Sequence, residues 1–144
     1  MSYVMTLEER PLQEEIAKVG GGLAAFNRRM ASDDGYRPLA IFLRDAEGAV
    51  VGGLSGSTYW TWFSIDLLWI EDRLRGQGHG HRLLEEAERE AVRRGCLNAN
   101  LDTLSFQAPA FYERHGYTIF GELTDFPIGH SRLYMVKRLV EGAS

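Results

Sequence analysis

Three glycines at alternate positions, Gly76, Gly78 and Gly80, separate an apolar run (residues 65–70) from a helical pattern. This order predicts a strand, a glycine-rich turn and a helix. Glycines leave their amide N–H groups uncovered, and the start of a helix adds unpaired N–H donors and the positive end of the helix dipole. With Arg75 beside it, the turn is typical of an anion site, such as one for the phosphates of a nucleotide-like cofactor.

The spacing of the glycines excludes two common phosphate loops. A Walker loop continues with Lys and Ser or Thr, whereas Gly80 is followed by His81 and Arg82. A dinucleotide-binding fingerprint needs a sixth-position glycine, which here is His81. The remaining pattern, Arg75-x-x-Gly78-x-Gly80, resembles the pyrophosphate-binding signature of the GNAT superfamily of N-acetyltransferases. A glycine-rich turn that only caps a helix is the alternative interpretation.

A second pattern lies in residues 105–117, which read Ser-Phe-Gln-Ala-Pro-Ala-Phe-Tyr-Glu-Arg-His-Gly-Tyr. It resembles the GNAT pattern of a strand followed by Ala, three residues, Tyr and a Gly-aromatic pair. The two motifs stand one helix and one strand apart, as in that superfamily. On both motifs the chain is identified as a member, similar to a group of small bacterial acetyltransferases.

The resemblance implies that acetyl-CoA is the acetyl donor. Its pyrophosphate would rest on backbone N–H groups of residues 77–81, and its pantetheine arm would insert between two splayed strands. Many members have Asn where this chain has Ser105, and a serine reaches less far, so Ser105 and Gln107 are alternative substitutes. The implied cofactor-binding residues are Leu68, Trp69, Ile70, Arg75, Gly76, Gln77, Gly78, His79, Gly80, His81, Ser105 and Gln107.

Two residues are candidates for catalysis. Tyr112 matches the family position of the general acid, and an ordinary tyrosine pKa of about 10 keeps it protonated; alternatively it only packs with Phe111. Asp66 is a charge inside an apolar strand, and alternation would place it on the face of Ser64 and Leu68. It is a candidate general base or a group that orients a cationic substrate, with a structural ion pair to an arginine as the alternative.

Other reactive or aromatic residues carry less specific signals. His79 and His81 have no spacing partner that would complete a zinc site, so no metal is expected. Four aromatic residues could bind an amine through cation–π contacts, or pack in the core or against a second copy. They are Tyr59, Trp60, Trp62 and Phe63.

The periodicity predicts the elements that hold these residues. We expect a short first strand at residues 3–7 and, over residues 11–30, two helices separated by Gly20, Gly21 and Gly22, which cost roughly 3 kcal/mol in a continuous helix. A hairpin, a third strand (residues 64–71) and the helix (residues 78–94) follow. After them we expect a strand at residues 98–103, a short helix at 108–115 and two final strands at 117–122 and 132–139. The expected fold class is α/β (α+β), a GNAT-like, mostly antiparallel sheet of about six to seven strands with flanking helices, in one domain over residues 1–144.

Composition narrows the classes of function. The 144 residues are 44% hydrophobic and 25% charged, and the net charge of −4 gives no reason to expect nucleic acid or a membrane as partner. One cysteine, Cys96, and no membrane-length apolar run favour a cytoplasmic protein. The expected function is direct acetyl transfer to a primary amine of a small molecule or protein, with a homodimer plausible. The alternative is a non-catalytic acyl-CoA-binding sensor or regulatory module.

Overall fold

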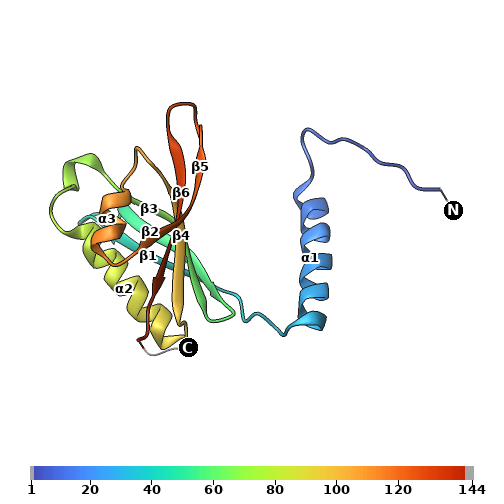
Figure 1. Cartoon of the computed structure of the whole chain (residues 1–144), viewed down its shortest axis with the longest axis horizontal. Coiled ribbons are helices and arrows are strands. Elements are labelled where there is room, and N and C mark those ends of the chain that lie inside the picture. The colour runs from blue at the N-terminus through green and yellow to red at the C-terminus, as the bar shows by residue number, and fades with distance from the viewer. Residues whose placement is uncertain (1, 142–144) are drawn as a thin grey trace. The chain divides into compact units, whose positions relative to one another are not determined.

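The computed structural model describes residues 2–141 and divides the chain into two compact units, Met1–Asp34 and Gly35–Ser144 (Figure 1). Each unit is described by itself. The described part of the first unit contains one helix, α1 (Gln13–Met30), and the second contains every strand that the structure describes. The expectation of one domain over residues 1–144 stays a prediction.

Two sequence predictions for the first unit are wrong. Helix α1 runs without a break through Gly20–Gly22, and residues 3–7 form no strand. Helix propagation is cooperative, so glycines that each weaken a helix need not end it, and α1 has acidic residues in its first turn and basic residues in its last. A strand needs a neighbour, and the first unit offers none among its described residues. No helix within residues 2–141 is long and apolar enough to cross a membrane.

The second unit is built on one six-stranded sheet in the order β1-β2-β3-β4-β6-β5. Only β3 and β4 run parallel; all other neighbours are antiparallel. This confirms the predicted fold class. The strands are β1 (Arg37–Arg44), β2 (Val50–Tyr59), β3 (Trp62–Ile70), β4 (Asn98–Leu104), β5 (Thr118–Thr124) and β6 (Ser131–Arg138).

Helices α2 (His79–Arg93) and α3 (Pro109–Arg114) lie on the same side of this sheet (Figure 1). The predicted apolar stripe of α2 is buried, and it packs with the inward side chains of the strands. Burial of this apolar surface is the main source of stability for the unit. The core includes Leu83, Leu84, Ala87 and Ala91 of α2, with Leu54, Phe63, Ile65, Ala99, Leu101, Tyr117 and Met135.

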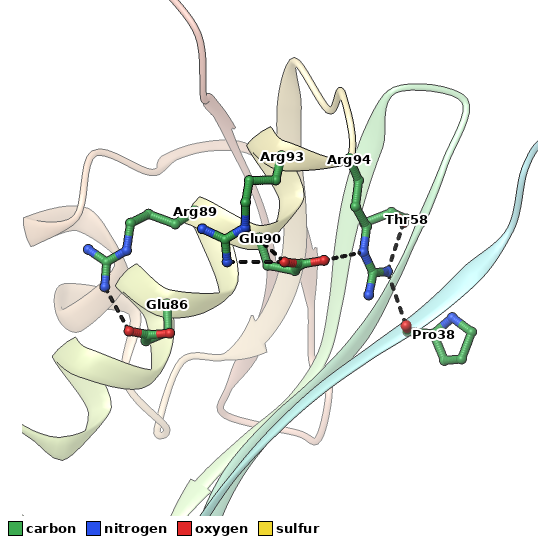
Figure 2. A network of polar contacts seen from close by, with 7 residues as sticks. All are labelled: Pro38, Thr58, Glu86, Arg89, Glu90, Arg93 and Arg94. Atoms are coloured by element: carbon green, nitrogen blue, oxygen red, sulfur yellow. Dashed lines mark hydrogen bonds and ion pairs between the residues drawn. The ribbon is translucent and has the colours of Figure 1, made fainter.

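Arg94 fastens the C-terminal end of α2 to the first two strands (Figure 2). Its guanidinium donates to Glu90 Oε2 at 2.8 Å, to the Pro38 carbonyl at 3.0 Å and to Thr58 Oγ1 at 3.2 Å. Hydrogen bonds from Arg94 and then Arg93 lower the pKa of Glu90 below its ordinary value. Glu90 therefore stabilises the fold at neutral pH, and this contribution is lost as the pH falls through its depressed pKa.

Replacing Arg94 is expected to destabilise the protein. Arg94→Ala removes hydrogen bonds from a side chain that is only 13% exposed, and we expect it to lower the free energy of urea unfolding by about 2 kcal/mol. The matched control is Arg93→Ala, since Arg93 also pairs with Glu90 but is 61% exposed and should cost well under about 1 kcal/mol. Equal unfolding midpoints for the two variants would contradict this role of Arg94.

Candidate active site

The central feature of the second unit is a pair of parallel strands, β3 and β4, that diverge. The β3–β4 ladder runs from Trp62 beside Asn98 to Ile65 beside Leu101 and stops there. Both strands continue, β3 to Ile70 and β4 to Leu104. Beyond Ile65 the edge of β3 that faces β4 therefore has backbone groups without a ladder partner in β4, and such an edge can accept an extended ligand.

The point of divergence coincides with a β-bulge at Asp66. Ser55 of β2 pairs with Leu67, whereas the next residue, Gly56, pairs with Ile65, so Asp66 has no partner in β2. Such an extra residue bends its strand and re-aims the side chains that follow. The predicted alternation is thus wrong beyond Ile65: Asp66 is exposed, whereas Leu68 packs against the core.

The glycine-rich turn forms the second wall of the site. Gly76 and Gly78 have φ values of 76° and 85°, which glycine adopts readily. Gly78 is the N-cap of α2 and no side chain caps the helix, so its first N–H groups have no intrahelical acceptor. The first turn of α2 holds no acidic residue, and Arg75 stands beside it, bonded to the Ile70 carbonyl at 3.3 Å and to Asp72 at 3.2 Å.

Helix α3 brings Tyr112 to the site. Tyr112 is buried, and its ring packs edge-on against Phe111 and Tyr117. Its hydroxyl makes no hydrogen bond within residues 2–141. Every fully buried side-chain nitrogen or oxygen among those residues has a hydrogen-bond partner, so the hydroxyl oxygen of Tyr112 is not fully buried. Tyr112 is one of the residues that line the cavity described below. Burial raises the pKa of Tyr112 to about 12, so the hydroxyl stays protonated.

These parts surround one cavity of about 780 Å³. All predicted site residues except Gln77 and Ser105 line it. The cavity also brings in residues that the sequence analysis did not single out: Leu67, Leu74, Asp102, Thr103, Phe106, Ala108, Phe111 and Arg114. Asp102 carried the same signal as Asp66, a single charge inside an otherwise uncharged strand pattern.

The two proposed substitutes for the family asparagine have different positions. Ser105 accepts a hydrogen bond from the Ser131 amide at 2.9 Å and thereby ties the end of β4 to β6. Gln107 lines the cavity, where its Oε1 accepts from the Leu104 amide at 2.8 Å and from Thr103 Oγ1 at 3.1 Å. The carboxamide of Gln107 is thus held in place with its Nε2 available to donate. Of the two residues, only Gln107 lines the cavity.

Three side chains near the turn have partners of their own. Gln77 donates to the Arg73 carbonyl at 3.3 Å, so its side chain is used in the turn. The rings of His81 and His115 meet with Nδ1 and Nε2 3.2 Å apart, and His81 Nε2 lies 3.0 Å from Glu85. Burial and then the neighbouring His81 lower the pKa of His115, which favours its neutral form. Within residues 2–141 no group of three or more His, Cys, Asp or Glu side chains could hold a metal ion.

The predicted aromatic group divides between two environments. Phe63 is fully buried in the core. Tyr59, Trp60 and Trp62 line a different cavity of about 530 Å³, together with Asn100, Phe120 and Val136. The two cavities have no lining residue in common. Both of the predicted roles, an acceptor site and a packing surface, stay open for these three residues.

Comparison with known proteins gives a consistent result. Residues 6–117 match the family model described as "Acetyltransferase (GNAT) family". The blasticidin-S acetyltransferase of Streptomyces morookaense is 39% identical over 107 residues, which are 72% of this chain and 79% of that protein. A crystal structure of a candidate acetyltransferase from Agrobacterium tumefaciens is 35% identical, with a TM-score of 0.89 over 96% of this chain and 99% of that one. A candidate streptothricin acetyltransferase from Bacillus anthracis, solved with acetyl coenzyme A, shares the fold at 18% identity, with a TM-score of 0.61 over 70% of this chain and 62% of that one.

Proposed function

Because the chain belongs to the GNAT family of acetyltransferases, we propose that it transfers the acetyl group of acetyl-CoA directly to a primary amine. The observation that carries the proposal is the divergence of β3 and β4 beyond Ile65 and Leu101, beside a cavity that is also lined by the uncapped start of α2 and by Tyr112. The anion site suits the pyrophosphate of CoA, the strand edge suits the amides of its pantetheine arm, and a proton donor suits the departing thiolate.

The residues of the cavity fit this donor. The uncapped N–H groups of His79, Gly80 and His81, with Arg75 beside them, suit a pyrophosphate, since helix starts favour anions. The unpaired edge of Leu68, Trp69 and Ile70 suits the amides of a pantetheine arm, as in strand addition. Gln107 Nε2 offers a further donor to the same arm.

The proposed chemistry is a single transfer within a ternary complex. A cationic acceptor amine first gives one proton to solvent, because only the neutral amine can attack. Its nitrogen then bonds to the thioester carbonyl carbon, the carbon–sulfur bond breaks, and the nitrogen loses a second proton to Asp66, directly or through water. The Tyr112 hydroxyl gives a proton to the departing sulfur and regains one from solvent. A β3 backbone N–H beside the carbonyl oxygen stabilises the charge that develops there, and proximity supplies much of the acceleration.

Asp66 suits the role of base because it lines the cavity and forms no hydrogen bond or ion pair within residues 2–141. The arginine pair considered from the sequence is therefore absent from that part of the chain. We expect Asp66→Asn to lower kcat at neutral pH about 100-fold with little change in acetyl-CoA affinity. The measurement is steady-state kinetics beside calorimetric titration of acetyl-CoA.

Asp102→Asn is the matched control for Asp66. Asp102 lines the same cavity, but its carboxylate already accepts from Arg132 at 2.9 and 3.0 Å. We expect a smaller loss of kcat from this variant. Wild-type kinetics for a folded Asp66→Asn protein would exclude a catalytic role for Asp66.

The acceptor is proposed to be a cationic amine on a small molecule or on a protein. The acidic balance of the chain, −4 overall, and the bare carboxylate of Asp66 both favour a positively charged partner. One relative is named for blasticidin S, so this compound belongs in any acceptor panel with polyamines and aminoglycosides. We also propose a cytoplasmic enzyme that needs no nucleic acid, membrane or metal.

An acceptor screen tests the proposed function. The protein is incubated with acetyl-CoA and each amine, release of free thiol is followed, and the products are weighed by mass spectrometry. We expect thiol release that depends on the amine, together with one added acetyl group on the acceptor. Tight acetyl-CoA binding with no release for any amine would instead favour the non-catalytic acyl-CoA-binding module.

A further inference from the structure

Helix α1 presents an apolar stripe that its own unit leaves uncovered. Six apolar residues follow one another at intervals of four, three, four, three and four, and none is less than 49% exposed. No residue of α1 is buried. The six are Leu12, which is the N-cap, and Ile16, Val19, Leu23, Phe26 and Met30. Intervals that alternate between four and three residues are typical of the apolar positions of a coiled coil, which form a narrower stripe than a helix that covers a sheet. We call these six residues the seam of α1.

The charges at the two ends of α1 indicate what covers this seam. Glu14 and Glu15 lie in the first turn, and Arg28 and Arg29 lie in the last. A parallel pair of such helices would bring like charges together. An antiparallel pair brings each acidic end beside the basic end of the other copy, with Glu15 of one helix flanking the seam opposite Arg29 of the second copy. The surface is therefore complementary to itself, as a two-fold interface requires.

In the antiparallel register, each of the six apolar residues also lies level with an apolar residue of the second copy. Val19 lies level with Leu23 of the second copy, and Leu23 with Val19 of the second copy, at the centre of the helix. The outer layers match Ile16 with Phe26 and Leu12 with Met30. Each layer thus combines side chains from both copies, and the seam is covered along its whole length.

Two of the three glycines of α1, Gly20 and Gly22, are explained by the same arrangement. At 100° per residue, Gly20 and Gly22 flank the seam on its two sides, whereas Gly21 points directly away from it. An added Cβ on Gly20 or Gly22 would meet nothing within 4 Å among the described residues of the first unit, so this unit by itself gives no reason for small residues there. The backbone of a second helix at this level would give such a reason, because glycine permits close approach of two backbones.

We propose that α1 pairs with α1 of a second copy as an antiparallel two-helix interface, whose two-fold axis passes level with Gly21 between the flanking Gly20 and Gly22. The occupant of the stripe is therefore the same helix of another chain. This interface makes the protein a homodimer. The proposal does not depend on the acetyl-transfer activity, and its tests do not use that activity.

Cysteine cross-linking of the full chain tests the geometry. In this register Gly20 faces Gly20 of the second copy across one flank, and Gly22 faces Gly22 across the other. We expect Gly20→Cys and Gly22→Cys to form a covalent dimer under mild oxidation at least about tenfold faster than Gly21→Cys, since a disulfide needs Cα atoms within about 7 Å. The native Cys96 is only 2% exposed and should not contribute.

The outcome of this comparison is decisive in either direction. Faster cross-linking at the two flanking positions supports the helix pair. Equal rates at all three positions, or no covalent dimer although a maleimide reagent labels each new thiol, would overturn it, as would a dimer that forms through another surface.

Charge reversal supplies a second, independent test. We expect Arg29→Glu to weaken the dimer about tenfold in sedimentation velocity, because it places two carboxylates opposite each other twice per dimer. Adding Glu15→Arg to the same chain should restore the affinity. Lys18→Glu, on the side away from the seam, is the control. Failure of the double variant to recover, or a wild-type chain that sediments as a monomer, would overturn the antiparallel pair.

Discussion

Tyr112→Phe is expected to lower kcat about 100-fold while the affinity for acetyl-CoA changes little. Tyr112 lines the cavity, and the variant loses only its hydroxyl, which bonds to no residue within 2–141. The ring keeps its packing against Phe111 and Tyr117. The loss therefore falls on the transfer step and not on binding or folding. Stopped-flow thiol release and calorimetric titration of acetyl-CoA separate these quantities.

The pH dependence sharpens this prediction. With a pKa of about 12, Tyr112 stays protonated well into the alkaline range, so its proton donation should not fail below about pH 11. The wild-type rate should thus not fall in the alkaline range through loss of this proton, and the deficit of Tyr112→Phe should stay nearly constant from neutral to alkaline pH. An undiminished rate at every pH would withdraw the general-acid assignment.

Tyr117→Phe is the matched control. Tyr117 is the other buried tyrosine beside α3, but its hydroxyl donates to Glu88 Oε2 at 2.8 Å and it does not line the cavity. The substitution removes one hydrogen bond to a charged group, so we expect a loss of about 2 kcal/mol of unfolding free energy. We expect kcat to stay near the wild-type value, which would separate the loss of a buried hydroxyl from the loss of a proton donor.

Gly56→Ala is expected to disrupt both the fold and the reaction. Gly56 lies where the bulge brings β2 closest to β3: an added Cβ would overlap the Ser64 carbonyl oxygen and lie 3.1 Å from Ile65 Cα. Both neighbours are backbone, so the strands themselves must move. We expect the free energy of unfolding to fall by about 3 kcal/mol and kcat/KM to fall about 100-fold, because Asp66 and the open edge of β3 shift together.

Gly121→Ala is the control for this substitution. Gly121 is also a strand glycine at a register shift, but an added Cβ there would meet the nearest atom, in Tyr134, at 3.7 Å, an ordinary contact. We expect wild-type kinetics and a small change in unfolding free energy. Urea unfolding and steady-state kinetics on both variants check the comparison, and a Gly56→Ala protein with wild-type stability and turnover would show that the bulge does not constrain the site.

Helix α1 shows where prediction from local sequence failed. Adding the helix propensities of Gly20–Gly22 predicted a break, but α1 is continuous. Propensity gives the cost of each residue by itself, whereas helix propagation is cooperative, so weak positions inside a helix need not end it. The absent strand at residues 3–7 failed for a related reason, since a strand exists only through a neighbour.

Local residue types determined the glycine-rich turn, because the conformation of a turn and the start of a helix depend on adjacent residues. The positive φ values of Gly76 and Gly78, the uncapped start of α2 and the order of strands around them follow from that stretch and the hydrophobic periodicity. Only the tertiary structure decided which residues face the cavity beside them. The bulge that frees Asp66, the place of Asp102 in the same cavity and the use of Ser105 to join β4 to β6 arise from strand register, which is set by residues far apart in the chain.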